Sequence, residues 1–148
     1  MDFFTLMITL PLSHLHILFG GTIIFCMLGP LYFTPITPIG KKWISYFPKP
    51  ENENIPMSGA FVGIILLQIF MGFIVTHTVV AFWLFATANG LSETVTTLFV
   101  VKLYMGFVFI KDIGHWFFEK KPIVLILITL GYWLTGILGV CGLLAYFI

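Results

Sequence analysis

Residues 123–148 read IVLILITLGYWLTGILGVCGLLAYFI and contain no charged side chain. A helix of this length, rising about 1.5 Å per residue, is longer than the roughly 30 Å hydrocarbon core of a bilayer. Three further apolar stretches of comparable length precede it in the chain. The four predicted membrane spans cover residues of about 12–34, 57–88, 92–118 and 123–147.

The overall composition is that of a membrane protein. The 148 residues are 59% hydrophobic and only 9% charged, whereas soluble domains are about 25% charged. Mean hydropathy is +1.09, and the spans leave only short connections with no room for a soluble catalytic domain. We therefore predict an all-α, polytopic membrane protein with four transmembrane helices in an antiparallel bundle, residues 1–148 forming a single domain. The net charge of +1 gives no indication of nucleic acid binding.

Proline, glycine and capping residues predict where the spans begin and end. Gly29-Pro30 and Pro38 indicate that the first helix stops, and a polar, extended connection is expected over residues 40–54. Asn89-Gly90 is typical of a helix end, and Ser92 is a favoured N-cap residue for the third span. The segment after the third span is short enough to predict a tight connection to the fourth.

The lysines predict the topology. Outside the spans, lysines occur in the connection between the first and second spans and in the connection between the third and fourth. The second connection and both termini have none. By the positive-inside rule, both lysine-bearing connections face the matrix or cytoplasm and both termini lie opposite. We expect either a mitochondrial or a bacterial inner membrane.

Small residues predict where helices touch. Gly59 and Gly63 form a GxxxG pattern in the second span, and Gly131, Thr135 and Gly139 form a stripe at four-residue spacing in the fourth. Such residues let helix backbones approach closely in membranes. Packing within the bundle is the favoured interpretation, and an intersubunit face is the alternative.

The third span differs from the others because it carries charge. Charged groups inside a bilayer are costly and usually mark a site or a partner. Lys111, Asp112, His115 and Glu119 share one side of the predicted helix near its inner end. An ion-paired edge in contact with headgroups and water explains them, while a headgroup-binding or proton-handling site using His115 is the sharper alternative.

Lys102 is not explained in that way. It lies about 15 Å into the third span, near the bilayer midplane, which is too deep for its side chain to reach either interface. No carboxylate of the chain is expected at this depth, and Gln68 of the second span is the best internal hydrogen-bond candidate. Three possibilities stay open: a neutral lysine, a carboxylate on another subunit, or an anionic or carbonyl-bearing ligand.

The histidines raise the question of a cofactor. His16 and His77 are predicted in one leaflet on adjacent helices, an arrangement that in principle ligates a haem or flanks a quinone. His14 and His16 point to different helix faces, however, and His16 is shallower than His77, so we favour hydrogen-bonded histidines without a metal. We expect no catalytic residues and no cofactor, although structural lipids are expected.

Two segments resemble a known family. Gly29-Pro30-Leu31-Tyr32-Phe33-Thr34-Pro35 followed by Gly40-Lys41-Lys42-Trp43 resembles the end of the first helix in small four-helix membrane proteins catalogued as a domain of unknown function, the 1761 family. Gly106-Phe107, Phe118-Glu119 and Gly131-Tyr132-Trp133 resemble its second half. Tyr32-Phe33 replaces the usual Trp-Tyr pair, and Lys102 is outside the family pattern. The resemblance implies four spans, and it carries over no catalytic residue because none is established for the family.

Two functions are expected from these features. The first is a non-catalytic accessory subunit of a larger membrane complex, of the respiratory or ATP synthase type, which packs against other membrane subunits through its third span and glycine-rich faces. The alternative is a membrane protein or enzyme that binds a lipid, quinone or small molecule in a cavity near Lys102, Gln68 and His77.

Overall fold

The protein is all-helical over the described residues, which are 14–46 and 59–148 of a computed structural model. The helices are α2 (Leu15–Phe33), α3 (Pro38–Ile44), α4 (Gly59–Ala88), α5 (Glu93–Glu119) and α6 (Ile123–Phe147). By length and composition, α2, α4, α5 and α6 can each cross a membrane. The predicted fold of four transmembrane helices is confirmed, and the chain is an integral membrane protein. The predicted beginnings of the first and second spans, residues 12–13 and 57–58, lie outside the described residues.

The ends of the helices follow from local chemistry. Gly90 has a φ of +85° directly after α4, a conformation that glycine adopts without steric cost. The Ser92 hydroxyl accepts a hydrogen bond from the Val95 backbone N–H at 3.4 Å and caps α5. At the other end of α5, Lys120 takes the left-handed conformation, with a φ of 52°, and turns the chain into α6. α4 ends at Ala88, α5 runs from Glu93 to Glu119, and α6 begins at Ile123.

The connection after α2 corrects one prediction. Pro30 lies inside α2, which continues for three more residues to Phe33, and Pro38 begins α3 instead of ending a helix. Proline is well tolerated in a first helical turn, because the N–H that it lacks has no partner inside the helix there. Thr37 caps α3 by accepting a hydrogen bond from the Gly40 N–H at 3.0 Å. The first part of the segment expected to be extended is therefore helical.

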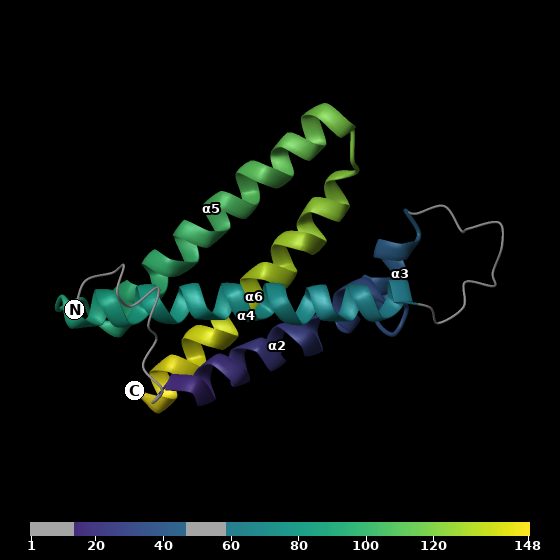
Figure 1. Cartoon of the computed structure of the whole chain (residues 1–148). Coiled ribbons are helices and arrows are strands. Elements are labelled where there is room, and N and C mark those ends of the chain that lie inside the picture. Colours follow the sequence, from purple (N-terminus) through teal and green to yellow (C-terminus); the bar gives the residue numbers. More distant parts are fainter. Residues whose placement is uncertain (1–13, 47–58) are drawn as a thin grey trace.

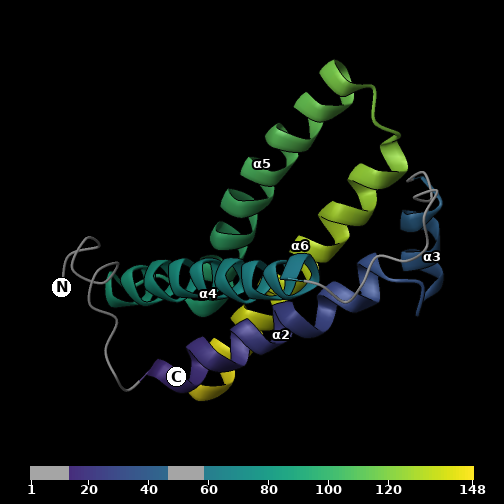
Figure 2. The same ribbon diagram turned by 45° about the vertical axis from the view of Figure 1, so that its right-hand side comes forward.

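The long helices run alternately up and down (Figure 1). α2 lies along α4 and is crossed by α6, whereas α5 approaches α4 mainly at the end where the two are joined (Figures 1 and 2). The turn between α5 and α6 stands away from α4 in both views. α5 is thus the most peripheral of the four long helices.

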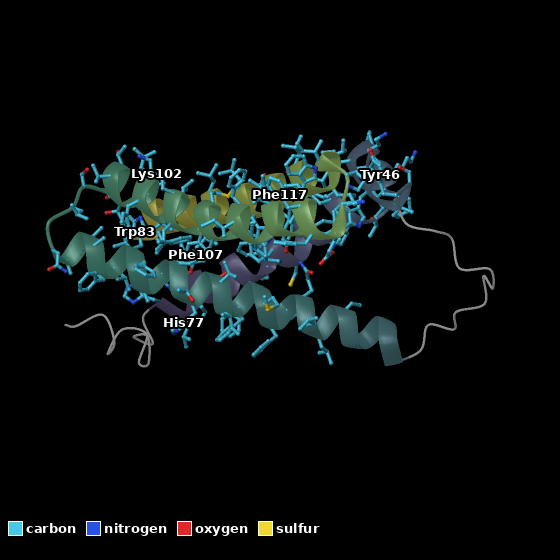
Figure 3. The ribbon with its side chains drawn as sticks, turned by 90° about the horizontal axis from the view of Figure 1, so that it is seen from above. Tyr46, His77, Trp83, Lys102, Phe107 and Phe117 are labelled. Atoms are coloured by element: carbon cyan, nitrogen blue, oxygen red, sulfur yellow. The ribbon has the colours of Figure 1, made fainter. Side chains whose placement is uncertain are left out.

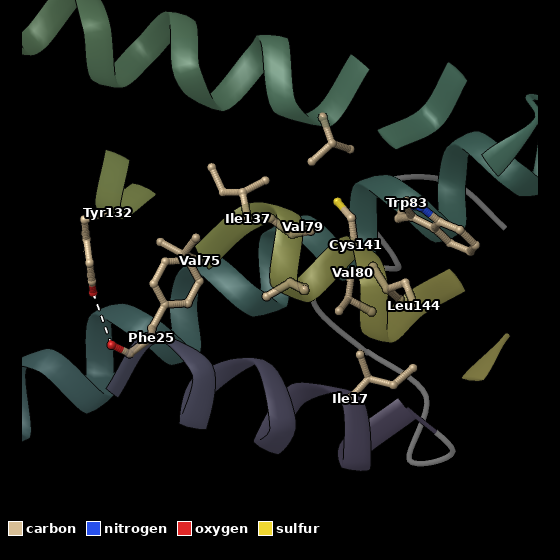
Figure 4. Close-up of a cluster of buried hydrophobic side chains, with 12 residues drawn as sticks. Ile17, Phe25, Val75, Val79, Val80, Trp83, Tyr132, Ile137, Cys141 and Leu144 are labelled. Atoms are coloured by element: carbon tan, nitrogen blue, oxygen red, sulfur yellow. Dashed lines mark hydrogen bonds between the residues drawn. The ribbon is translucent and has the colours of Figure 1, made fainter. Parts of the chain in front are cut away.

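The core lies where α2, α4 and α6 meet (Figure 4). Phe25 is fully buried there, among apolar side chains that include Val79 and Ile137. A Cβ at Gly136 of α6 would lie 2.2 Å from the Phe25 ring, so only glycine admits that ring. Gly21 of α2 similarly faces Thr76 of α4. Close packing at glycines therefore joins three of the four spans, as is common for membrane helices.

Candidate functional site

The least buried long helix carries the unusual lysine. In α5, 11% of the most apolar segment is buried inside the molecule, compared with 28–33% in the other three. Lys102 is exposed on α5, and four other residues lie on the same side of this helix within two turns of it. We call this group the Lys102 face, and its members are Leu98, Phe99, Lys102, Gly106 and Phe109.

The Lys102 face is open and mostly apolar. Leu98, Phe99 and Phe109 are each about half exposed, at 54%, 50% and 48%. A Cβ at Gly106, one turn after Lys102, would meet nothing within 4 Å. The Lys102 face is therefore mostly apolar, with one charged side chain among its members.

Lys102 has no carboxylate near it in the described part of the chain. The carboxylate side chains there belong to Glu93, Asp112 and Glu119, all on α5. The nearest of them along the helix is Glu93, nine residues or about 13 Å away. The ammonium group must therefore find its counter-charge elsewhere or remain uncompensated in the membrane.

Gln68, the predicted internal partner of Lys102, lies elsewhere. Its amide Nε2 donates hydrogen bonds to the Tyr132 hydroxyl at 2.5 Å and to the Phe25 carbonyl oxygen at 3.4 Å. It lines a cavity of about 240 Å³ between α2, α4 and α6, and neither Lys102 nor His77 lines that cavity. The predicted grouping of Lys102, Gln68 and His77 is therefore not formed around this pocket.

The histidines are also separated. His77 stacks on Phe73, with ring centroids 6.4 Å apart, and His16 makes an edge contact with Phe147 at 5.2 Å. Figure 3 shows Lys102 and His77 at opposite edges of the molecule. Within residues 14–46 and 59–148, no group of three His, Cys, Asp or Glu residues is placed to hold a metal ion.

The small residues of α6 face α2. A Cβ at Gly131 would lie 3.3 Å from the Tyr32 ring, and one at Gly139 would lie 3.1 Å from Ile24. The hydroxyls of Tyr32 and Thr135 share a hydrogen bond of 3.0 Å. This stripe therefore packs within the molecule.

The GxxxG pattern of α4 is different. A Cβ at Gly63 would meet nothing within 4 Å, and the surroundings of Gly59 lie outside the described side chains. Gly63 therefore packs against no other described part of the molecule, unlike the glycines of α6 that face α2.

The charged end of α5 forms a pocket with α3 and α6. Its volume is about 460 Å³, and the side chains that line it include Asp112, Lys111, Lys121, Trp43, Phe33 and Leu125. Asp112 is only 6% exposed, whereas Lys111 is on the surface. We call this cavity the inner-end pocket. The side chain of His115, a predicted neighbour of Asp112, is outside the described side chains.

Lys121, which lines this pocket, is paired with Glu119. Their side chains form an ion pair, with Lys121 Nζ 2.6 Å from the carboxylate, and both are nearly half exposed. An exposed pair of this kind contributes about 0–1 kcal/mol to stability. The pair offsets the charge of Lys121, which is one of the residues that line the pocket.

Comparison with known proteins agrees with this architecture. Residues 17–145, which run from the first turn of α2 almost to the end of α6, match the family model described as Protein of unknown function (DUF1761). The chain belongs to the DUF1761 family. Neither the curated proteins nor the solved structures gave a match. The resemblance noted in the sequence is therefore confirmed, and it identifies a family without assigning an activity.

In this DUF1761 member, two residues of the inner-end pocket were not predicted from the sequence as site residues. Trp43, noted only for the family resemblance, comes from α3, where an extended connection was expected, and Lys121 was considered only for topology and the same resemblance. Trp43 packs edge-on against Phe33, with ring centroids 4.8 Å apart. An aromatic residue beside paired lysines at a membrane interface was the available signal.

Proposed function

We propose that this DUF1761 protein is a non-catalytic accessory subunit of a larger membrane complex, and that α5 is the helix through which it joins the complex. The supporting observation is the exposed Lys102 at mid-membrane depth. A lysine at the centre of a membrane helix costs about 2.5–3.5 kcal/mol on insertion scales, so a lipid-facing lysine is unfavourable unless a partner covers it. The kind of complex, respiratory or ATP synthase, stays a prediction.

The surface around Lys102 specifies the partner's chemistry. Half-exposed aromatic and aliphatic side chains surround the ammonium group, and Gly106 leaves space for close helix contact. A complementary surface is a transmembrane helix with an apolar face and one carboxylate or other strong acceptor at the same depth. Small residues and interhelical polar contacts are the usual basis of helix association in lipid.

A different protein fits this role better than a second copy of the chain. Two copies related by an axis along the membrane normal keep each residue at the same depth. Lys102 would then meet Lys102 of the other copy, and Glu93 and Asp112 would stay displaced along the axis. Charge complementarity therefore favours a heteromeric complex.

The orientation in the membrane follows the same proposal. α3, with Lys41 and Lys42, lies at the same end of the bundle as the α5–α6 turn, which carries Lys120 and Lys121 (Figure 1). The positive-inside rule assigns this end to the matrix or cytoplasmic side. The other end of the bundle, where α6 ends, then faces the opposite compartment.

Replacing Lys102 tests the proposal. We expect Lys102→Leu to reduce at least tenfold the amount of other membrane subunits that co-purify with the chain in mild detergent. Lys102→Arg, which keeps the positive charge, should retain most of them. Quantitative mass spectrometry of the purified material, normalised to the chain itself, provides the measurement.

A control substitution separates a lost interface from a lost fold. Phe19 of α2 is 61% exposed, and among the described residues α2 makes no contact with α5, so Phe19→Leu should leave co-purification unchanged. Equal recovery of the same subunits with Lys102→Leu and with the natural chain would contradict the proposal.

A further inference from the structure

The inner-end pocket has the position of a lipid headgroup site. Asp112 is seven residues, or about 10 Å, from the end of α5, and the lysines of the α5–α6 turn lie at the same end of the bundle. Apolar side chains, Phe33 and Leu125, line the pocket beside the charged ones. A ligand that fits must therefore have both a polar group and an apolar part.

Side chains of both charges line the pocket. Lys111 and Lys121 are positive and Asp112 is negative, and Lys121 also pairs with Glu119 outside the lining. A ligand that carries one positive and one negative group matches both kinds of side chain, whereas a purely anionic ligand matches the lysines alone.

The buried carboxylate specifies the positive group. Asp112 is only 6% exposed. A buried carboxylate is stabilised when N–H groups donate hydrogen bonds to it. A carboxylate accepts up to about four hydrogen bonds, so it accommodates a ligand's donors in addition to any within the chain. A primary ammonium supplies three N–H donors, while a quaternary ammonium supplies none. The Trp43 indole offers a cation–π surface to either group.

We propose that the inner-end pocket binds the phosphoethanolamine headgroup of a zwitterionic phospholipid. The ammonium group lies against Asp112 and Trp43, and the phosphate lies between Lys111 and Lys121. The acyl chains leave along the apolar side of the pocket, past Phe33 and Leu125. Lys102 itself is nine residues before Lys111 along α5, and no member of the Lys102 face lines the pocket.

Lipid selectivity tests the proposed site on the natural chain. The full-length protein in mild detergent is titrated with phosphatidylethanolamine, its N-monomethyl and N,N-dimethyl forms, and phosphatidylcholine, all with the same acyl chains, and binding is read by native mass spectrometry. We expect affinity to fall stepwise with each methyl group, and phosphatidylethanolamine to bind at least tenfold more tightly than phosphatidylcholine. Equal binding along the series overturns the proposal.

Two carboxylate variants on α5 locate the effect. Asp112→Asn should reduce the preference for phosphatidylethanolamine to less than twofold, because the amide lacks the negative charge. Glu93→Gln makes the same chemical change at the opposite end of α5 and should leave the preference intact. A preference that survives Asp112→Asn overturns the assignment. If Asp112→Asn does not fold, the lipid titrations of the natural chain test the proposal: a stepwise loss of affinity with each methyl group supports it, and equal binding overturns it.

Competition with O-phosphoethanolamine, which has the same headgroup but lacks acyl chains, tests whether the occupant is a lipid or a small soluble molecule. We expect it to compete at least a hundredfold more weakly than the lipid, because it makes no contact with the apolar side of the pocket. Competition at equal concentration overturns a lipid as the occupant. Loss of subunits with Lys102→Leu is independent of all these results, so the proposed site and the proposed function can fail separately.

Discussion

Gly136→Ala is expected to lower the free energy of unfolding by about 3 kcal/mol, the upper part of the usual range for overpacking a core. The new Cβ would lie 2.2 Å from the Phe25 ring, more than an ångström inside normal contact. The ring has little room to move, because Phe25 is fully buried and lies against the rings of Tyr132 and Trp133. Reversible unfolding of the purified protein in mixed micelles measures the change.

Gly142→Ala provides the matched control for this prediction. It makes the same change on the same helix, at an exposed position where the new Cβ would meet nothing within 4 Å. Alanine is about 1 kcal/mol more favourable than glycine within a helix, so Gly142→Ala should be neutral or slightly stabilising. If the two variants are equally stable, α6 does not pack against Phe25 as described.

Gly40→Ala should detach α3 from the end of α2. A Cβ at Gly40 would lie 1.6 Å from the Thr34 carbonyl oxygen, and because this atom belongs to the backbone, no side-chain rotation relieves the clash. Lys41 and Lys42 lie inside α3, and a protease cleaves there only when the helix opens. We expect trypsin to cut at these lysines at least tenfold faster in the variant, as measured by the masses of the fragments over time.

Gly63→Ala, on α4, is the control for the trypsin experiment on Gly40→Ala. Gly63→Ala should leave the rate of cleavage at Lys41 and Lys42 unchanged, because its Cβ meets nothing within 4 Å. Since Trp43 lines the inner-end pocket from α3, Gly40→Ala should also weaken phosphatidylethanolamine binding. An unchanged cleavage rate in Gly40→Ala would show that α3 is not held against Thr34.

The four spans could be predicted from the sequence because each depends on local properties. Continuous hydrophobicity over about 20 residues is sufficient to identify a membrane helix. Gly90 and Ser92 specify the boundary between α4 and α5 through backbone conformation and capping. α3 was missed because Pro38 is compatible both with the end of one helix and with the first turn of another.

The site could be predicted only in part, because it depends on how helices are rotated and how far they extend. The sequence gives the depth of Lys102 but not the direction in which it points. Gln68 was expected beside it because it lies ten residues into the predicted second span, at a comparable depth, but its amide donates to Tyr132 and to the Phe25 carbonyl oxygen. The pocket around Asp112 joins α3, α5 and α6, and no local pattern indicates contacts between segments so far apart.

Site-specific photo-crosslinking in native membranes tests most directly whether α5 contacts another subunit. A photoreactive phenylalanine analogue is placed at Phe99 or at Phe109, on either side of Lys102. We expect both positions to give an adduct with the same protein, lost with Lys102→Leu and kept with Lys102→Arg. Adducts with lipid alone at both positions would contradict a partner on the Lys102 face.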